Sequence, residues 1–345
     1  MKIAITADPE LPVPPLLYGG IERIIDMLIA QYTKKGHEVL LFGNEESVTS
    51  AKLIPYPSKS SFGIKNILKN TLTVSKLLTN KEMKNVDVVH SFGRLAYLTP
   101  ILPTSIPILM SYQREPTISQ IKKAVQLSKK NTLHFSGCSE YIASQIRPYA
   151  PSHAVFNGIP IEIYDFVEKV ENDAPLVFLG RVEHIKGTHI AIEIAKKTRR
   201  KLIIAGNIPK DDEQTGYFNS QIKSHLDDTQ IIYVGAVNDT QKNEILGKAA
   251  AFLMPILWNE PFGIVMAEAM ACGTPVIGFG RGSVPEVVKH GINGYICQTL
   301  QQMIEAVEKI DSISRLEVRK DTESRFIADV ISEQYLEIYK KIKKL

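Results

Sequence analysis

The stretch AAFLMPILWNEPFGIVMAEAMACGTPVIGF, residues 250–279, decides the fold class of this chain. It opens with an apolar run, continues through a helical pattern and closes with a second apolar run. Short runs that are apolar on both faces are typical of strands in a parallel sheet covered by helices. Pro261 suits the first turn of the helix, and Gly273 suits its end. The stretch therefore predicts a strand, a helix from Pro261 to about Ala271, and a second strand.

The same alternation extends through the rest of the chain and implies α/β domains with doubly wound parallel sheets. Before residue 156 the expected strands are KIAIT, HEVLLFG, VDVVHSF, IPILMSY and TLHFSG, with helices near 20–35, 64–79, 94–102, 117–130 and 139–147. A linker follows at 156–175. After it the expected strands are PLVFLG, RKLIIAG, QIIYVG, AAFLMP, TPVIGF and GYIC, with helices near 186–198, 214–226, 239–248, 261–271, 284–290 and 300–310.

We therefore expect two Rossmann-like domains, an N-terminal one over 1–156 and a C-terminal one over 157–329. Residues 330–345 are expected to form a helix that returns to the N-terminal domain. Ligands bind at the carboxyl ends of the strands in open parallel sheets. Two such sheets that face each other would form a cleft with one ligand on each lip, which suits a transfer between two substrates.

Composition excludes several classes of protein. The 345 residues are 44% hydrophobic and 23% charged, as in ordinary soluble domains. Three cysteines (Cys138, Cys272 and Cys297) are too few and too scattered for a disulfide framework or a zinc site. The chain begins with a strand pattern, and no apolar run reaches the roughly 18 residues that span a bilayer. Secreted, transmembrane, collagen-like and disordered proteins are excluded, and a cytoplasmic location is expected.

The charge of the chain is unevenly distributed. Residues 1–155 hold 18 Lys and Arg against 11 Asp and Glu, whereas the remainder holds 23 against 26. This asymmetry indicates an anionic partner for the first part of the chain, either a membrane surface, a phosphorylated acceptor or a polyanion. Solvated helix faces would give the same pattern, so both readings stay open. A single Trp and the lack of a nucleic-acid motif argue against a nucleic-acid partner.

The segment FGIKNILKNTLTVSKLL, residues 62–78, has apolar residues near helical spacing and several lysines. A helix of this kind can dip into an anionic membrane. It can equally pack its apolar face on the sheet, and the sequence leaves both possibilities open.

Two glutamates mark the strongest candidate site. Glu260 and Glu268 are separated by seven residues around the start of the expected helix. The backbone N–H groups there would form an anion site, and Gly263 would let a ligand approach the backbone closely. The residues that would contribute these groups are Phe262, Gly263, Ile264 and Val265. An acidic helix cap without a ligand is the alternative.

Cations and a glycine pair accompany these glutamates. The segment FLGRVEHIKGTHIAI places Arg181 just after a strand and Lys186 five residues later, on a loop that opens at the ligand-binding edge of a sheet. Such a pair can bind phosphate, although a surface loop can carry solvated cations without a ligand. In PPLLYGGIER, Gly19 and Gly20 open the first helix, again an arrangement that suits phosphate.

In combination these segments resemble family GT4, the retaining nucleotide-sugar glycosyltransferases of the GT-B fold. The resemblance covers nearly the whole chain. It is carried by YGGIER at 18–23, VDVVHSF at 86–92, FNGIPI at 156–161, GRVEHIKG at 180–187, EPFGIVMAE at 260–268 and GRGSVPEVVKHGINGY at 280–295. The loop Gly-Arg-Gly-Ser at 280–283 departs from the plain glycine pair of many members, which puts its sugar contacts in doubt.

The resemblance implies a role for each matching residue. Arg181 and Lys186 would hold the donor diphosphate, with Arg181 expected to matter most. Glu260 would touch the hydroxyls of the transferred sugar, and Glu268 those of the ribose. The amides of Phe262, Gly263, Ile264 and Val265 would line the sugar and phosphate, and Gly20 would bring its amide to the diphosphate when the cleft closes. His90 would sit beside the reacting sugar.

The resemblance further implies metal-independent transfer by front-face attack, with a UDP-sugar as the commonest donor and no cofactor. No Asp-x-Asp metal motif follows a strand. The acceptor would be a glycan, a lipid-linked saccharide or a small molecule, bound near SYQREP, where Tyr112 and Arg114 follow a strand of the first domain. A salt-bridged surface role for Arg114 stays open. The alternatives are a sugar-nucleotide epimerase of the same fold and a catalytically silent nucleotide-binding partner of another transferase.

Overall fold

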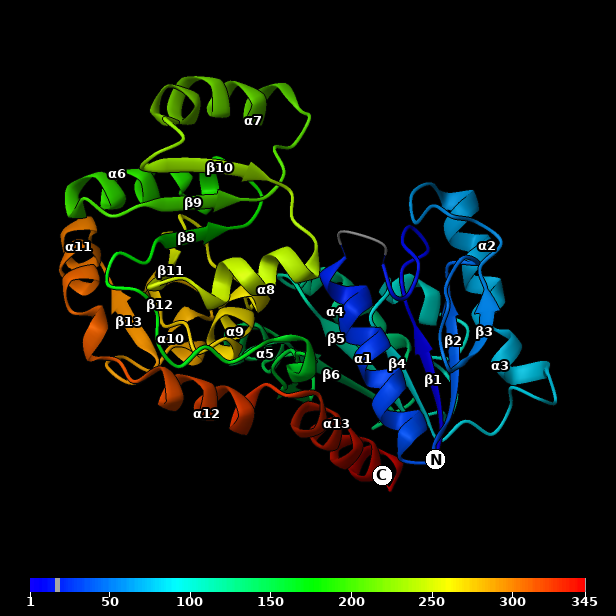
Figure 1. Cartoon of the computed structure of the whole chain (residues 1–345). Helices are drawn as coiled ribbons and strands as arrows, with labels where there is room; N and C mark the ends of the chain where they lie inside the picture. Colours follow the sequence, from blue (N-terminus) through cyan, green and yellow to red (C-terminus); the bar gives the residue numbers. More distant parts are fainter. Residues whose placement is uncertain (16–18, 345) are drawn as a thin grey trace. The chain divides into compact units, whose positions relative to one another are not determined.

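The structure, a computed structural model, describes residues 1–15 and 19–344 (Figure 1). It divides into two compact units. The first domain comprises Met1–Gly158 and Ala328–Leu345, and the second domain comprises Ile159–Ile327. The chain therefore leaves the first domain once and returns to it with its last helix.

The first domain is built on a seven-stranded sheet in which every pairing is parallel, with the order β3-β2-β1-β4-β5-β6-β7. Its strands are β1 (Lys2–Thr6), β2 (Glu38–Gly43), β3 (Lys52–Pro55), β4 (Val88–Ser91), β5 (Ile108–Tyr112), β6 (Leu133–Gly137) and β7 (Ser152–Ala154). Its helices are α1 (Gly20–Lys34), α2 (Ile64–Val74), α3 (Lys76–Thr79), α4 (Ile118–Leu127), α5 (Glu140–Ile146) and α13 (Ala328–Lys343), with a 3-10 turn η1 (Leu95–Leu98).

All the strands expected before residue 156 are present, and the sheet gains two short edge strands that were not expected. β3 ends in a proline and β7 is the polar tripeptide Ser-His-Ala, so neither has the apolar run that marks a buried strand. The helix expected over 64–79 is divided into α2 and α3 near Ser75, and the helix expected over 94–102 is only the 3-10 turn η1.

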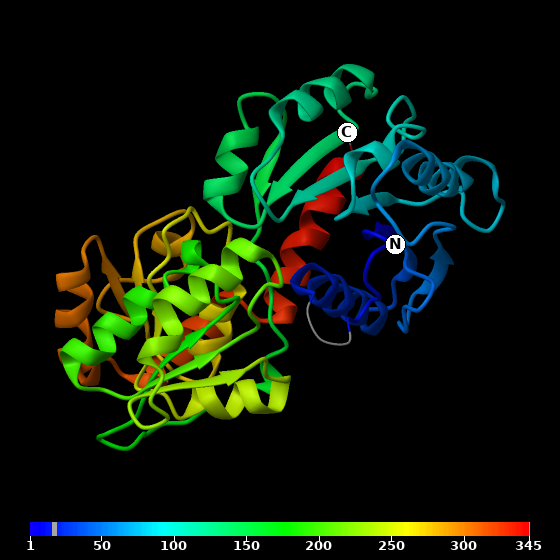
Figure 2. The ribbon, with the colours of Figure 1, turned by 90° about the horizontal axis from the view of Figure 1, so that it is seen from above.

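The last helix completes the core of the first domain. Figure 2 shows α13, in red, beside α1, in blue, and the two helices are in contact. Tyr32 of α1 and Tyr339 of α13 are fully buried, and their hydroxyls are 3.0 Å apart. Because both rings keep a hydrogen-bond partner, they can be buried without losing one.

The second domain has a six-stranded parallel sheet with the order β10-β9-β8-β11-β12-β13. Its strands are β8 (Leu176–Leu179), β9 (Leu202–Ala205), β10 (Ile231–Gly235), β11 (Ala251–Met254), β12 (Val276–Phe279) and β13 (Gly294–Cys297). The helices are α6 (Thr188–Thr198), α7 (Asp212–Tyr217), α8 (Asp239–Gly247), α9 (Ile264–Ala271), α10 (Val284–Val287), α11 (Leu300–Glu308) and α12 (Arg315–Arg325), with a 3-10 turn η3 (His184–Lys186). The two α/β sheets match the expected fold class.

The helix after β11 begins later than the sequence predicts. Its first residue is Ile264 rather than Pro261, because Gly263 caps it with a left-handed backbone (φ 71°). Pro261 and Glu260 therefore belong to the loop between β11 and α9. None of the helices in residues 1–15 and 19–344 is long and apolar enough to cross a membrane.

A buried arginine donates hydrogen bonds to several separate segments in the interior of the second domain. Arg315, at the start of α12, donates hydrogen bonds to the carbonyl oxygens of Val167 (2.6 Å), Ala249 (2.8 Å) and Gly247 (2.8 Å). It also reaches the carbonyl of Cys272 and the hydroxyl of Thr274. Burial lowers the pKa of this guanidinium to about 10, so it stays charged at neutral pH and each of these bonds is charge-assisted.

Replacing Arg315 by Met should destabilise the second domain, because the carbonyls it serves would be left buried and unpaired. We expect the free energy of unfolding to fall by about 3 kcal/mol. Trp258 is the only tryptophan of the chain and lies in this domain, so urea unfolding followed by its fluorescence reports the change. Lys320→Met, on the exposed face of the same helix, is the matched control and should change little. Equal effects of the two substitutions would contradict this role of Arg315.

Candidate functional site

A lysine and a glutamate meet at the carboxyl edge of the second sheet. The Lys186 Nζ atom lies 2.7 Å from Oε2 of Glu260, and both side chains are largely buried. Trp258 donates from Nε1 to the same carboxylate oxygen (3.1 Å), and the Lys186 Nζ lies 4.6 Å from the centroid of its ring. One carboxylate therefore receives two donors, and the lysine has an aromatic wall.

Two glycines allow the loops to approach closely enough for this pairing. Gly187 has φ 75°, and a Cβ atom there would lie 2.0 Å from the carbonyl oxygen of Pro255. Gly282 has φ 56°, and its Cβ would lie 2.3 Å from the carbonyl oxygen of Glu260. Any larger residue would push these loops apart, so the glycines are required by packing as well as by their backbone conformation.

The helix α9 begins four residues beyond Glu260. Gly263, Ile264 and Val265 are half-buried, and the N–H groups of a first turn have no partner within their own helix. Phe262 is buried and packs its ring against Phe326, so its side chain belongs to the core. The arrangement offers backbone donors and the positive end of a helix dipole beside an ion pair.

Arg181 lies on the loop that carries Lys186. Its Nη1 pairs with Oε1 of Glu183 at 2.7 Å, and its side chain is about two-fifths exposed (41%). Glu183 is buried, and its Oε2 has no hydrogen-bond partner among the described residues. The guanidinium is thus held at one end and accessible to a ligand at the other.

Glu268 is paired with residues that the sequence analysis did not single out. Its Oε1 accepts hydrogen bonds from Lys242 Nζ (2.6 Å) and from the Tyr164 hydroxyl (2.7 Å). Burial, followed by the charge of Glu268, raises the pKa of Tyr164, so this phenol remains a donor at neutral pH. Lys242 sits in a polar helix and Tyr164 in the expected linker, so no pattern in the sequence connects either with Glu268.

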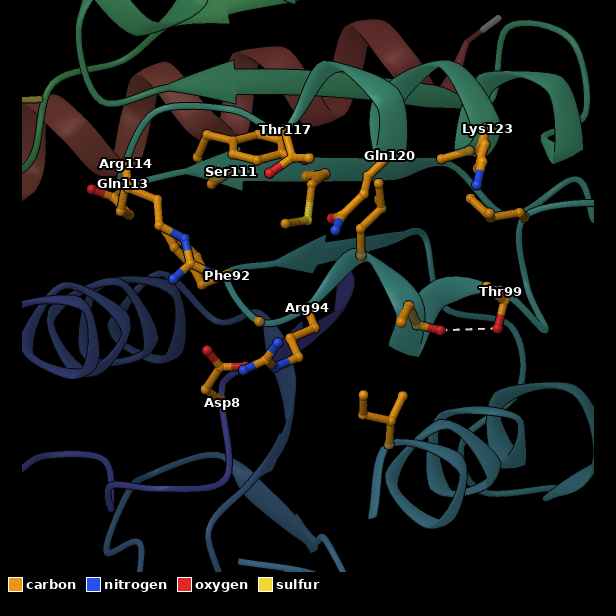
Figure 3. Close-up of a pocket in the computed structure, with 18 of the residues that line it drawn as sticks. Asp8, Phe92, Arg94, Thr99, Ser111, Gln113, Arg114, Thr117, Gln120 and Lys123 are labelled. Carbon is orange, nitrogen blue, oxygen red and sulfur yellow. Dashed lines mark hydrogen bonds between the residues drawn. The ribbon is translucent and has the colours of Figure 1, made fainter. Parts of the chain in front are cut away.

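The first domain contains a cavity of about 680 Å³, here called the first-domain cavity, beyond the carboxyl ends of β1, β4 and β5. Both predicted acceptor-side residues, Tyr112 and Arg114, line it. Figure 3 shows Arg94 beside Asp8, with Arg114 pointing toward them and Lys123 entering from α4. Asp8 and Arg94 are not among the residues predicted from the sequence, although each follows the end of a strand, a position that indicates a ligand-binding residue.

Polar atoms with no protein partner cluster in this cavity. Asp8 Oδ1, Arg94 Nε, Tyr112 OH and Gln113 Nε2 are buried and have no hydrogen-bond partner among the described residues. Burial and the charge of Glu10 raise the pKa of Asp8 to about 6, although Arg94 and Arg114 act in the opposite direction. Unpaired buried polar groups are rare in folded proteins, so this cavity is built for a polar ligand.

The prediction that His90 contacts the reacting sugar is wrong for this structure, because the residue is fully buried. Its Nε2 is bonded to Ser111 Oγ (2.6 Å) and its Nδ1 to the Tyr339 hydroxyl, so both ring nitrogens are used inside the core. Burial lowers the pKa of this imidazole to about 3, and the ring stays neutral. Phe92, two residues later, is the residue that reaches the first-domain cavity.

The remaining predicted residue, Gly20, is the first residue of α1, with Gly19 as the N-cap. A Cβ atom at Gly20 would meet nothing within 4 Å, whereas at Gly19 it would lie 2.7 Å from Pro15. Gly19 is therefore required by packing, whereas a side chain at Gly20 would meet open space. Tyr18 of the motif YGGIER lies outside the described residues.

Comparison with known proteins identifies a family for the second domain. Residues 161–329, which contain every second-domain residue named above, match the family model described as glycosyl transferases group 1. The second domain carries this family's domain, and the chain is a glycosyltransferase. The predicted resemblance to the GT4-like glycosyltransferases is confirmed.

Full-length relatives extend the likeness over both domains. The alpha-maltose-1-phosphate synthase of Mycolicibacterium smegmatis is 28% identical over 379 residues, covering 95% of this chain and 97% of that protein. A solved glycosyltransferase from Rickettsia africae aligns with a TM-score of 0.79 at 18% identity, over 99% of this chain and 98% of that one. Anabaena HepE, solved in complex with UDP, aligns with a TM-score of 0.75 at 18% identity, over 99% and 100%. The structural matches establish the GT-B fold.

The raised pKa of Asp8 predicts a pH dependence of stability. The folded state favours the neutral carboxyl, so its contribution is complete below about pH 4 and is lost as the pH rises through about 6. Asp8→Asn imitates the neutral form at every pH. The free energy of unfolding of the wild type should therefore fall by about 2 kcal/mol relative to Asp8→Asn between pH 4 and 7. Urea titrations followed by circular dichroism measure this difference in the free energy of unfolding. If the wild type and Asp8→Asn showed the same dependence on pH, the pKa of Asp8 would not be raised by folding.

Proposed function

We propose that this glycosyltransferase is a retaining enzyme that takes a sugar from a nucleotide diphosphate donor, with UDP as the nucleotide. The observation that carries the proposal is the Lys186–Glu260 ion pair beside the amino terminus of α9. It combines a cation and backbone donors, which suit a diphosphate, with a carboxylate, which suits sugar hydroxyls. Anabaena HepE, a protein of the same fold, is solved with UDP, which supports the choice of nucleotide.

Each group in the second domain has a proposed partner on the donor. Lys186 and Arg181 bind the diphosphate, Glu260 accepts hydrogen bonds from the hydroxyls of the transferred sugar, and Glu268 accepts them from the ribose. The contacts of Glu268 with Lys242 and Tyr164 fall on Oε1, so Oε2 is the oxygen assigned to the ribose. Backbone N–H groups at the start of α9 complete the phosphate contacts within the second domain.

Before the donor binds, the ion pair between Lys186 and Glu260 keeps both side chains in position. Each partner of a buried ion pair needs an opposite charge or a hydrogen-bond partner to stay in a low-dielectric site. On donor binding, the lysine gains a phosphate and the glutamate gains hydroxyls, so neither is left unpaired. Because each side chain replaces one partner by another, a charged ligand can bind in this partly buried site without leaving a buried charge unpaired.

The charges on these residues support transfer without a metal. Cleavage of the bond between sugar and phosphate adds a negative charge to the departing diphosphate, and Arg181, Lys186 and the positive end of α9 supply the countercharge. In front-face attack the acceptor hydroxyl donates its proton to the leaving phosphate oxygen. The new bond then forms on the face that the phosphate leaves, and no protein nucleophile is needed.

We assign the acceptor to the first-domain cavity. Its two arginines and its lysine favour an acceptor with a phosphate or carboxylate group, and Tyr112, Gln113 and Asp8 can pair with hydroxyls. A glycan or a lipid-linked saccharide meets these requirements. The proposed location is the cytoplasm, with peripheral contact at the inner face of the membrane.

A nucleotide panel tests the donor site. In thermal unfolding with EDTA present, UDP should stabilise the wild type more than GDP or ADP does, because uracil is the proposed base. Ligand at 100 times its dissociation constant adds about 2.7 kcal/mol to the free energy of unfolding. Arg181→Ala and Lys186→Met should each remove most of this stabilisation. Lys248→Met, an exposed lysine of the same domain, should retain it.

Two results would contradict the donor assignment. If no diphosphate stabilises the protein, the second-domain site does not bind nucleotide. If Lys186→Met responds to UDP like the wild type, the diphosphate binds elsewhere. A requirement for added divalent metal would contradict the proposed metal independence.

The stereochemistry of transfer has its own test. With an α-linked UDP-sugar, the product should carry the α configuration, which the coupling constant of the anomeric proton in NMR reports directly. A β product would show inversion, and the enzyme would then need a base aligned opposite the leaving group.

A further inference from the structure

The helix α2 in the first domain is amphipathic, but its apolar face is turned to solvent. Ile64, Leu68 and Leu72 are 85%, 56% and 58% exposed, and Phe62 just before the helix is 70% exposed. The three helical residues follow one another at intervals of four, so they form one stripe along the helix. An exposed stripe of large apolar side chains on a folded domain marks an interaction site.

The opposite face of α2 is polar, buried and bonded to the domain. Asn70 donates from Nδ2 to the Ser58 carbonyl and accepts from the Ser58 N–H, each at 3.2 Å. Thr71 and Thr73 are also buried on this side, and Thr71 donates to the Ala96 carbonyl. These contacts fix the orientation of the helix, so the apolar stripe cannot turn inward without breaking them.

The sequence interval that contains α2 carries charge of one sign, although Lys52 is paired with Glu82, and Lys59 with Glu45 and Glu46. No Asp or Glu occurs between Glu46 and Glu82, whereas that interval contains Lys52, Lys59, Lys65, Lys69, Lys76 and Lys81. Lys65 and Lys69 lie within α2, each directly after a residue of the apolar stripe. A second interval without Asp or Glu runs from 116 to 139 and contains α4, whose Leu127 is 58% exposed.

These features fit a lipid surface better than a protein partner. Protein–protein interfaces are depleted in lysine, whereas helices that lie in a membrane interface combine an apolar face with lysines that reach lipid phosphates. An anionic bilayer offers both an apolar interior for the stripe and a negative surface for the lysines. Nucleic acid would satisfy the lysines but leave the leucines exposed to water.

We propose that α2 docks the first domain on an anionic bilayer, with Phe62, Ile64, Leu68 and Leu72 inserted among the acyl chains and Lys65 and Lys69 on the headgroups. Ile67 of α2 lines the first-domain cavity, and Lys123 and Leu127 of α4 line its other side. The cavity therefore lies directly behind the docked helix. This part of the inference rests on the proposed acceptor site: an acceptor with a lipid anchor would reach the cavity without leaving the bilayer.

Vesicle sedimentation with the full chain tests the docking. The wild type should sediment with vesicles of phosphatidylcholine and phosphatidylglycerol and remain in solution with phosphatidylcholine alone. The triple variant Ile64→Gln, Leu68→Gln, Leu72→Gln should lose at least tenfold in partition coefficient. Lys65→Gln, Lys69→Gln should lose about tenfold at low salt and less at high salt. The control Ile292→Gln, Leu316→Gln removes exposed apolar residues of the second domain and should bind as the wild type does.

Several outcomes would overturn the inference. Equal sedimentation with neutral and anionic vesicles, or full binding by the triple variant, would exclude α2 as the docking element. A wild type that is dimeric by sedimentation velocity and a triple variant that is monomeric would identify a second copy of the chain as the occupant. The stripe is solvent-exposed, so the triple variant should keep the wild-type melting temperature.

Stabilisation by UDP separates this inference from the proposed function. The triple variant should respond to UDP as the wild type does, because the substitutions lie outside the second domain. Vesicle binding without any nucleotide response would refute the donor site and leave the docking intact. Stabilisation by a nucleotide without any vesicle binding would refute the docking and leave the donor site intact.

Discussion

The ion pair between Lys186 and Glu260 connects loops that are 74 residues apart, and the chemistry of the second domain depends on it. It forms because β8 and β11 pair in parallel at the centre of the sheet, which places the loops that follow them at one edge. Gly187 and Gly282 allow the loops to touch. The same edge receives the amino terminus of α9, so a cation, a carboxylate and backbone donors lie together through topology alone.

A row of hydrogen-bonded polar side chains is buried in the core of the first domain. The His90 ring is bonded to Ser111 on one side and to Tyr339 of α13 on the other. Ser111 is in turn bonded to Ser136, and Tyr339 lies against Tyr32 of α1. This row ties the last helix of the chain to the sheet of the first domain. It explains why a histidine at a strand end is structural here, while the ligand-facing positions fall to the residues that follow it.

Much of the fold was predictable because parallel strands buried on both faces leave short apolar runs. Such runs identified the central strands, whereas β3 and β7 lie at the edges and lack them. Glu260 and Lys186 could be predicted because each follows a strand on a loop of recognisable composition. Lys242 and Tyr164 could not, since their role comes from contact with Glu268 across the domain. The error at His90 has the same origin: a sequence shows where a strand ends, but not which of its last residues points into the core.

The exposed stripe on α2 shows a further limit of pattern reading. Apolar periodicity predicts an amphipathic helix, but the side that faces the domain is decided by the partners of Asn70 and Thr71.

A crystal structure with UDP tests most directly whether a nucleotide diphosphate binds at the Lys186–Glu260 pair. We expect diphosphate oxygens within hydrogen-bond distance of Lys186 Nζ and of the first amides of α9. A diphosphate bound away from both, with the ion pair intact, would contradict this expectation.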